Sequence, residues 1–430
     1  MAVDYASRLL FKVTPVDKSK AKCLSHALLL ANNLIHQTGK GTFAILPIGQ
    51  KIVDKLTKLV ENELHEIGAQ KCSLPAIGFE NVWKRSGRWD VYGSGLFRFK
   101  DRLNNQACLQ PTCEEMISNF AAQFGTFKAA SLPMMLFQST DKFRDEMNPR
   151  FGLLRSRQFI MNDLYSFDED KQNANNTYQR ISEIYRRIFF DHLKLNETMI
   201  VKASAGEMGG DLSHEYHLPN ESAEDRLLHC ENCRTTLQTE NSNAEKCPDC
   251  NTDLKSINSV EVGHTFQLGQ HYSSMFEALD ANRSPYFMCC FGLGISRLIA
   301  ASIDTLTISD KAMRLPKVIS PYKLAIVVPK VDGEHYAAKF THDLIANFNS
   351  LPNLNGDILV DDRLSKSVGR RLIELNQLGV PNIVVVSAKK SANPHDLVEM
   401  ELFRANPKEE DLKLVGMFTH SALMDFSRTF

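Results

Sequence analysis

The sequence predicts a multidomain protein of mixed α/β and α+β class, with a large N-terminal and a small C-terminal domain. A chain of 430 residues exceeds what one hydrophobic core usually serves. Residues 131–168 read as strand, charged loop and strand, and residues beyond 321 alternate between strand and helix. Two prolines interrupt the pattern in LPKVISP. We therefore expect domains at 1–316 and 321–430.

The large domain shows further elements on either side of this hairpin. Residues 43–67 begin with FAILPIGQ and continue with apolar residues at helical spacing up to a glycine, which predicts a helix. The stretch GAQKCSLPAI is expected to be a strand leading to Pro75, and residues 171–195 a helix. Two more strands are predicted at VEVGHTFQLG and PYFMCCFGLG, and the second runs into the helix ISRLIAASID.

The small domain is predicted from three strands, KLAIVVPK, GDILVDD and NIVVVSAKK, with a helix in each interval. Strands that alternate with helices favour a small α/β domain with a partly parallel sheet.

Composition excludes few functions. An apolar fraction of 43% with 23% charged residues is ordinary for a soluble folded protein. Because the net charge is -1, a basic surface for a polyanion would have to be local. No apolar run is long enough to span a bilayer, so no membrane partner is expected.

The N-terminal segment MAVDYASRLLFKVTPVDKSKAKC has more basic than acidic residues and lacks the apolar core of a secretory signal. Its basic residues are Arg8, Lys12, Lys18, Lys20 and Lys22. This composition is compatible with a short organellar presequence and equally with an exposed terminal segment. Ten cysteines without a secretory signal indicate reduced thiols, some with a metal, rather than disulfides.

The segment from Phe143 to Asp163 is rich in arginine. It contains Arg144, Arg150, Arg155 and Arg157. Guanidinium groups clamp phosphate or carboxylate through paired hydrogen bonds. Arg155, Phe159 and Asp163 are spaced four apart, so on a strand they would share one face and could hold a nucleotide. The alternative is a solvated hairpin with surface arginines and a core phenylalanine.

The run FRDEMNPRFGLLRSRQFIMNDLYSFD resembles motif 2 of class II aminoacyl-tRNA synthetases, and most closely that of the prolyl members. The resemblance implies an antiparallel-sheet catalytic domain. It implies that Arg144 contacts the amino-acid carboxylate and the α-phosphate of ATP, and that Glu146 lies near the adenine amino group. Arg155 would bind ATP after the loop, and Phe159 would stack on adenine.

Two further segments resemble the remaining class II motifs. CFGLGISRLIAASID resembles motif 3, which implies that Arg297 binds the γ-phosphate beside Gly292 and Gly294. A glycine pair that lets a helix pack on a strand is the alternative. The helix ending near Gly68 and the strand up to Pro75 resemble motif 1, which implies a homodimer.

The stretch CLQPTCEEMISNF resembles the proline-pocket motif of this family, with Cys113 in the place of a serine. It implies that Thr112 and Glu114 hold the ammonium of L-proline while Arg144 faces its carboxylate. The alternative is a helix start with Thr112 as the cap and Glu115 completing a capping box. A capped helix start could also carry the pocket.

VEVGHTFQLGQHYS resembles a third string of the prolyl enzymes. It implies that Glu261 holds Mg²⁺ at an ATP phosphate, that His264 lies near the nucleotide and that Phe266 walls the proline ring. Without the resemblance, exposed polar residues on a strand would be expected. GGDLSHEYHL resembles a loop near the site, whose residues receive no individual role: Gly209, Gly210, Ser213, His214 and Glu215.

The implied activity is that of a prolyl-tRNA synthetase, which activates proline with ATP and esterifies it to tRNA(Pro). Catalysis would rest on positioning and charge neutralisation by Arg144, Arg155, Arg297 and the magnesium on Glu261, with no protein nucleophile. Two alternatives remain. One is another class IIa synthetase, such as a threonyl enzyme, and the other is a synthetase-like tRNA-binding protein without catalysis.

Four cysteines form the pairs CENC and CPDC within an insertion at residues 226–257. They are Cys230, Cys233, Cys247 and Cys250. Two such pairs predict one closed, structural zinc site, and four reduced thiols in an exposed insertion are the alternative. Many bacterial prolyl enzymes carry an editing domain in this interval. Its absence resembles mitochondrial enzymes, and also some bacterial ones, so we expect the mitochondrial matrix, with a bacterial-type cytoplasm as the alternative.

The C-terminal stretch GDILVDDRLSKSVGRRLIELNQLGVPNIVVVSAKK resembles the anticodon-binding domain of class IIa synthetases. The resemblance implies that Asp361, Asp362, Arg363 and Gly369 approach the anticodon, whose loop bases are read by stacking and edge hydrogen bonds. Acidic residues that end a strand are the alternative.

Overall fold

The computed structural model describes residues 3–17, 19, 21, 23–204, 206–223, 225–239, 244–388 and 398–430. Lys18, Lys20 and Lys22 of the basic N-terminal segment, and the final lysines of NIVVVSAKK, lie outside the described residues. The chain forms two compact units, and each is described by itself. The larger contains residues 37–43 and 56–301, and the smaller contains residues 1–36, 44–55 and 302–430.

The last change from the larger to the smaller unit along the chain falls between Ala301 and Ser302. N-terminal residues belong to the smaller unit because its strand β1 (Asp4–Tyr5) pairs in parallel with β17 (Ile358–Asp361). A two-residue strand is too short to leave a periodic signal in the sequence. The functional boundary expected at 316–321 stays a prediction.

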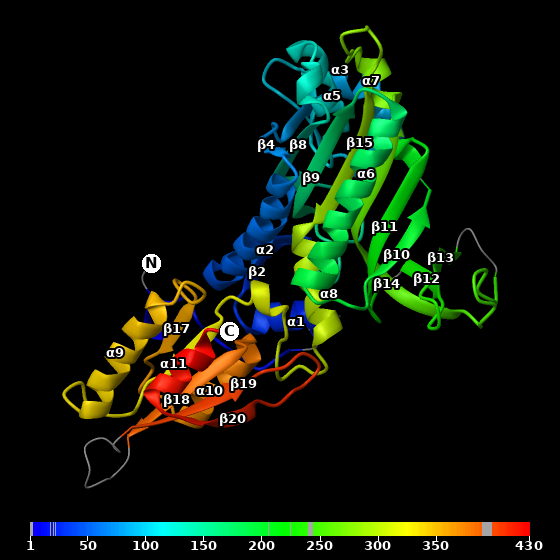
Figure 1. Ribbon diagram of the computed structural model, residues 1–430. Helices are drawn as coiled ribbons and strands as arrows, with labels where there is room; N and C mark the ends of the chain where they lie inside the picture. The colour runs from blue at the N-terminus through cyan, green and yellow to red at the C-terminus, as the bar shows by residue number, and fades with distance from the viewer. Residues whose placement is uncertain are drawn as a thin grey trace. The chain divides into compact units, whose positions relative to one another are not determined.

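Among the described residues, nine strands form the main sheet of the larger unit (Figure 1). Seven lie in the order β10 (Met199–Ala203), β11 (Leu212–Pro219), β14 (Lys255–Gly269), β15 (Phe287–Gly294), β9 (Gln158–Asp168), β8 (Met134–Phe143) and β4 (Gln70–Lys71). The hairpin β12 (Asp225–His229) and β13 (Thr236–Gln238) adds to β14. Neighbouring strands are antiparallel, except that β4 runs parallel to β8. The expected antiparallel catalytic sheet is therefore confirmed.

Helices and a small sheet complete the larger unit. They include α3 (Glu80–Arg85), α4 (Arg88–Val91), α5 (Glu114–Phe124), α6 (Lys171–Arg186) and α7 (His271–Phe276). The small sheet has the order β5 (Ile77–Phe79), β7 (Gln106–Leu109) and β6 (Arg98–Lys100). An aromatic cluster helps to hold the core, since Phe167 packs edge-on against Phe127 and Tyr286 at centroid distances of 5.6 and 5.9 Å.

Most of the expected elements of the larger part of the chain are present. The helix predicted at 43–67 is α2 (Pro47–Glu66), which ends before Gly68 at a φ of +83°. β15 leads directly into α8 (Ile295–Leu306), as expected. The strand predicted up to Pro75 was wrong in length, because only β4 pairs with β8. Beyond it, the amide of Leu74 donates to the side chain of Gln138 and leaves the ladder.

The sheet of the smaller unit has the order β1, β17, β16 (Leu324–Val327), β18 (Asn382–Ala388), β19 (Val398–Arg404) and β20 (Lys413–Phe418). The first four strands are parallel and the last two antiparallel. Helices α9 (Tyr336–Ser350), α10 (Val368–Leu378) and α11 (His420–Ser427) accompany it (Figure 1). The predicted α/β alternation with a partly parallel sheet is confirmed. Among the described helices, none is both long and apolar enough to cross a bilayer.

The acidic end of β17 takes part in a buried ion-pair cluster. Arg363 pairs with Asp361 at 2.5 Å and with Glu374 at 2.7 Å, and both carboxylates are buried. Asp362 accepts two hydrogen bonds from Ser7. The carboxylate of Asp361 is therefore buried and paired within the protein, and the expectation that this segment approaches the anticodon stays a prediction. Gly369, in the first turn of α10, has open space at the Cβ position.

Replacing Arg363 with leucine is expected to destabilise the smaller unit by about 3 kcal/mol, because the change leaves Asp361 buried without its cation. Hydrogen exchange of the amides in β16, β17 and β18 would measure this locally. Arg370→Leu is the control, since Arg370 also pairs with Glu374 but is 53% exposed. Equal destabilisation by the two variants would contradict the assignment.

Candidate active site

A cavity of about 330 Å³ lies within the larger unit, against β9, β14 and β15. Its volume suits a small-molecule ligand. The predicted residues that line it are Thr112, Glu114, Arg144, Phe159, Asp163, Glu261, His264, Phe266, Gly292, Gly294 and Arg297. Residues separated by almost two hundred positions in the sequence therefore meet at one site.

Strand periodicity explains how β9 lines the cavity. Phe159, Met161, Asp163 and Tyr165 are two apart, so they share one face, and all four line the cavity. On the neighbouring strand, Gly292 is opposite Asp163. A Cβ atom on Gly292 would meet Met161 only at ordinary contact distance, so the missing side chain leaves space at the cavity wall.

Arg144 directly follows β8 and enters the cavity beside an aromatic ring. Its guanidinium carbon lies 5.2 Å from the ring centroid of Phe159. Within the described residues, its buried Nε has no hydrogen-bond partner. Buried donors normally have acceptors, so this atom indicates a place for a ligand.

Arg297, in the first turn of α8, lines the same cavity. Its Nη1 donates to the carbonyl of Glu261 at 2.9 Å. Burial lowers the pKa of Arg297, the carboxylate of Glu261 opposes that shift, and the positive charge of Arg144 adds to it. Two guanidinium groups that repel each other in one cavity favour an anionic ligand.

The acidic side of the cavity is centred on Glu261. Its Oε1 lies 3.2 Å from Nδ1 of His264, whose Nε2 lies 2.5 Å from the hydroxyl of Ser213. Burial alone would raise the pKa of Glu261, but His264 and Arg297 outweigh it and lower the pKa to about 2. Potential ligand atoms of Glu215, Glu261 and His264 all lie within 4.8 Å of one another, so this group could hold a metal ion.

The cavity wall also contains Thr112 and Glu114, the residues predicted to bind the amino acid. The hydroxyl of Thr112 donates to Glu114 at 2.6 Å. Arg88 lies 3.3 Å from Glu114 and 2.9 Å from Glu115. Helix α5 begins at Glu114, with Cys113 at the cap position and no side-chain capping bond. The capping-box alternative is therefore wrong, and Thr112 is turned toward the carboxylate.

The ring of Phe266 forms a flat part of the cavity wall beside His264, the residue that contacts Glu261. Its ring is stacked on that of His264, with centroids 3.8 Å apart and planes inclined by 19°. The two stacked rings form one continuous part of the cavity wall, which begins at His264 beside Glu261 and continues with Phe266. Both rings lie on β14, two residues apart, so they share one face.

Asp163 has a different environment from the one expected. Its carboxylate accepts hydrogen bonds from Lys142, Gln138 and Tyr165, at 2.8, 2.9 and 2.8 Å. Burial raises its pKa, against these contacts. The hydroxyl of Tyr165 also accepts from the amide of Cys113 at 3.0 Å. Asp163 therefore supports the loop that carries Thr112 and Glu114, in addition to lining the cavity.

Arg155 and Glu146 do not line the cavity. They pair with each other at 3.0 Å, and the side chain of Arg155 is 44% exposed. The prediction that Arg155 shares a strand face with Phe159 is wrong, because a short 3₁₀ turn at Gly152–Leu154 places Arg155 before β9. Their expected contacts with ATP remain predictions.

Residues 209–215 lie beside the cavity without lining it. Ser213 contacts His264, whereas Nδ1 of His214 lies 2.7 Å from the hydroxyl of Tyr178. Gly210 adopts a φ of +108°, and a Cβ there would lie 2.0 Å from a backbone oxygen. A glycine is therefore required at this position.

Several lining residues were missed by the sequence analysis: Arg88, Tyr92, Met161, Tyr165, Ser204, Gly206, Met208, Val262, Gly263, Cys290 and Phe291. Met161 and Tyr165 could have been found by alternation from Phe159 along the strand. Arg88 lies in the irregular segment SGRWDVYGSG, where no periodic pattern indicates its direction.

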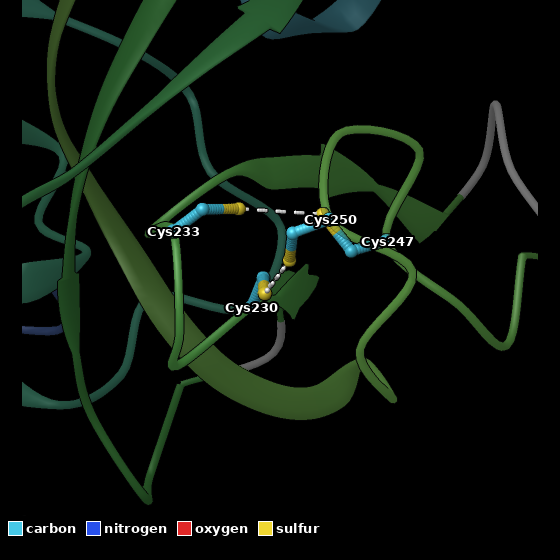
Figure 2. Close-up of side chains that lie close together, drawn as sticks. All are labelled: Cys230, Cys233, Cys247 and Cys250. Carbon is cyan, nitrogen blue, oxygen red and sulfur yellow. Dashed lines mark hydrogen bonds between the residues drawn. The ribbon is translucent and has the colours of Figure 1, made fainter.

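The cysteine quartet is brought together as predicted. Figure 2 shows Cys230, Cys233, Cys247 and Cys250 with their sulfur atoms close to one another. All four sulfurs lie within 4.8 Å of each other. This cluster could hold one metal ion through four thiolates.

Comparison with known proteins identifies the family of this chain. Residues 97–306 match the family model described as tRNA synthetase class II core domain (G, H, P, S and T). The chain is 37% identical over 384 residues to the probable mitochondrial proline–tRNA ligase of Rattus norvegicus, covering 87% of this chain and 80% of that protein. It is 32% identical over 438 residues to the proline–tRNA ligase of Ehrlichia ruminantium, covering 97% of each.

Solved structures share the fold. Giardia lamblia prolyl-tRNA synthetase in complex with prolyl-adenylate superposes with a TM-score of 0.74 at 17% identity, covering 96% of this chain and 76% of that chain. The synthetase of Cryptosporidium parvum, complexed with halofuginone and AMPPNP, gives 0.72 at 13% identity, covering 94% and 77%. The fold, the converging site residues and these identities lead to one conclusion. The chain is an enzyme of the class II aminoacyl-tRNA synthetases and belongs to the proline–tRNA ligase family.

Proposed function

We propose that this enzyme activates L-proline with ATP and transfers it to tRNA(Pro). The observation that carries the proposal is the convergence of Arg144 and Arg297 in one cavity that also contains Thr112 and Glu114. Guanidinium groups at one end suit phosphates, and a carboxylate at the other suits an ammonium. The cavity thus offers complementary charge to both substrates.

In the first step the proline carboxylate attacks the α-phosphorus of ATP, and the bond to pyrophosphate breaks. Arg144 would bind the attacking carboxylate and the α-phosphate, with its buried Nε available to an oxygen. Arg297 would bind the γ-phosphate and stabilise departing pyrophosphate. The catalytic contribution is alignment and charge stabilisation. The hydroxyl of the terminal tRNA adenosine then attacks the prolyl carbonyl and releases AMP.

The proline end of the site would select a protonated secondary amine. Glu114, held by Thr112 and Arg88, would accept from the ammonium. Phe266 would pack against the pyrrolidine ring. Because Arg88 faces two buried carboxylates, Glu114 and Glu115, this cluster can retain negative charge to receive the substrate cation.

Adenine would lie against Phe159, as the position of its ring beside Arg144 suggests. Glu146 and Arg155 would approach the nucleotide from the motif-2 loop. Their mutual ion pair would have to open or turn for these contacts, which their partial exposure permits.

Mg²⁺ would be held at Glu261 and Glu215, beside His264. Their donor set fits a hard cation, because two carboxylates lie close together and Glu261 stays ionised well below neutral pH. The ion would neutralise charge on the ATP phosphates.

Zn²⁺ would be held by Cys230, Cys233, Cys247 and Cys250. Four converging sulfurs fit a closed structural site that leaves no open position for substrate. Its place in the fold is taken up below.

The cellular setting is inferred from relatives. The mitochondrial enzymes of rat and human are 37% and 34% identical to this chain, which supports a mitochondrial matrix location, with a bacterial-type cytoplasm as the alternative. The same family relation supports the proposal of a homodimer through the motif-1 elements and of anticodon binding by residues 321–430.

Replacing Arg144 with alanine is expected to lower kcat/KM for proline-dependent ATP–pyrophosphate exchange by at least a hundredfold. The physical basis is the loss of about 3 kcal/mol of transition-state stabilisation. Arg102→Ala is the control, since Arg102 is exposed and does not line the cavity. Exchange driven by threonine, or exchange absent from the parent enzyme, would refute the proposed substrate or activity.

Replacing Glu114 with glutamine is expected to lower kcat/KM for proline about ten- to a hundredfold while changing the KM for ATP little. The substitution removes the charge that receives the ammonium, and hydrogen bonds to charged groups contribute about 1.5–3 kcal/mol. Steady-state exchange with each substrate varied in turn measures both constants. A parallel rise in the KM for ATP would contradict the placement of proline at Glu114.

A further inference from the structure

The two cysteine pairs occupy turns of the same construction. In the first, the amide of Cys230 donates to the carbonyl of Thr235 at 2.9 Å, and Arg234 has a φ of +63°. In the second, the amide of Cys247 makes the equivalent bond at 2.8 Å, and Asn251 has a φ of +58°. A repeated turn with a left-handed residue at the same place directs both thiols of each pair to one side.

The sulfur geometry suits one tetrahedral ion. Cys230 and Cys250 have sulfurs 3.4 Å apart, and so do Cys233 and Cys247. Zinc–sulfur bonds of about 2.3 Å at tetrahedral angles require sulfur separations of roughly 3.8 Å. Each cross-pair contact joins one turn to the other, as Figure 2 shows. The observed separations are much longer than the roughly 2.05 Å of a disulfide bond.

The cluster closes the end of a hairpin that belongs to the catalytic sheet. The first turn connects β12 to β13, and the second comes just before β14, with which β12 pairs. Few apolar side chains hold this hairpin. Its buried contribution to the adjacent core cluster is Leu227, beside Met199 and Val201. Such a small apolar contact favours a metal as the main support of the hairpin.

The hairpin reaches the acidic side of the cavity through Gln238, the last residue of β13. Its amide nitrogen donates to Oε2 of Glu215 at 3.0 Å. The same oxygen lies 2.9 Å from Nε2 of His217, whose other ring nitrogen contacts the hydroxyl of Ser259 at 3.0 Å. The second oxygen, Oε1, lies 3.8 Å from Nδ1 of His264. Gln238 thus holds one carboxylate oxygen of Glu215. The other oxygen faces Glu261 and His264, with which Glu215 could share a metal ion.

We propose that the zinc-bound hairpin is a positioning element for the divalent cation of the active site, acting through Gln238 on Glu215. Zinc fixes the two turns, the turns fix β13, and Gln238 orients Glu215 toward Glu261 and His264. Gln238 touches neither substrate nor the reacting atoms, so it is a positioning residue. The inference rests on the proposed function only for the identity of that cation.

The metal is tested first, on the purified full chain. We expect one zinc per chain by elemental analysis, and thiolate-to-metal charge-transfer absorption after exchange for Co²⁺. The double variant Cys233→Ser, Cys250→Ser should lose both signals, and hydrogen exchange in β12 and β13 should then increase. Four freely titrating thiols, or two disulfides, in the parent protein would overturn the proposal.

The coupling is tested with Gln238→Ala, in which the zinc ligands are intact. We expect unchanged zinc content and Mn²⁺ affinity weakened about three- to tenfold, measured by electron paramagnetic resonance with a non-hydrolysable ATP analogue. Glu231→Gln is the matched control, since Glu231 lies in the first turn and pairs with exposed Lys255. Its Mn²⁺ affinity should equal that of the parent.

Unchanged Mn²⁺ affinity in Gln238→Ala, or an equal loss in Glu231→Gln, would overturn the coupling. Neither readout requires proline activation. If the chain activated another amino acid, or none, zinc content and Mn²⁺ affinity would still decide the inference. A failure of the proposed substrate and a failure of the hairpin proposal are therefore distinguishable.

Discussion

The active site depends on holding the guanidinium groups of Arg144 and Arg297 in one cavity, where the Nε of Arg144 has no acceptor among the described residues. Burial lowers the pKa of Arg297, the carboxylate of Glu261 opposes that shift, and the charge of Arg144 adds to it, so the two guanidinium groups repel each other. Arg144 directly follows β8, and Arg297 lies in the first turn of α8 directly after β15, so both side chains begin at the ends of strands of one antiparallel sheet. A polyphosphate would relieve this repulsion. The fold therefore places these charges before the ligand binds, and this preorganisation is part of what catalysis requires.

The part of the cavity wall around Glu114, where we propose that proline binds, follows the opposite electrostatic rule. Glu114 and Glu115 are both buried, and Arg88 contacts both. Burial raises the pKa of Glu115, and the charge of Arg88 opposes that rise. A substrate ammonium would therefore add the second cation that two neighbouring carboxylates favour. The buried hydrogen bonds from Tyr165 to Asp163 and from the amide of Cys113 to Tyr165 support the loop that carries Thr112 and Glu114, so the proposed proline pocket is held by residues behind it as well as within it.

The sequence predicted those parts of the fold and site that follow from strand alternation and motif order. Phe159 and Asp163 share a face because both lie inside β9. Arg155 lies before the strand begins, so the spacing of four residues did not place it on that face. Arg88 could not be predicted, because its direction is set by tertiary contacts with Glu114 and Glu115. The same limit applies to β1, whose two-residue pairing is made with a distant strand and leaves no local pattern, and to the length of β4, which is shorter than the strand expected there.

The hairpin at the edge of the sheet shows how a short insertion can serve a distant site. An edge hairpin with little apolar contact gains weak support from burial, which scales with area. An ion held by the four thiolates would supply that support at a single point and would need no core. β12 pairs with β14 as far as Ser259, and β13 ends at Gln238, which contacts Glu215. An ion that fixed the two turns would therefore also restrain the position of Glu215 through these strands. In our proposal, order in the hairpin would thus become order in the carboxylate of Glu215, through backbone pairing and a single side-chain hydrogen bond.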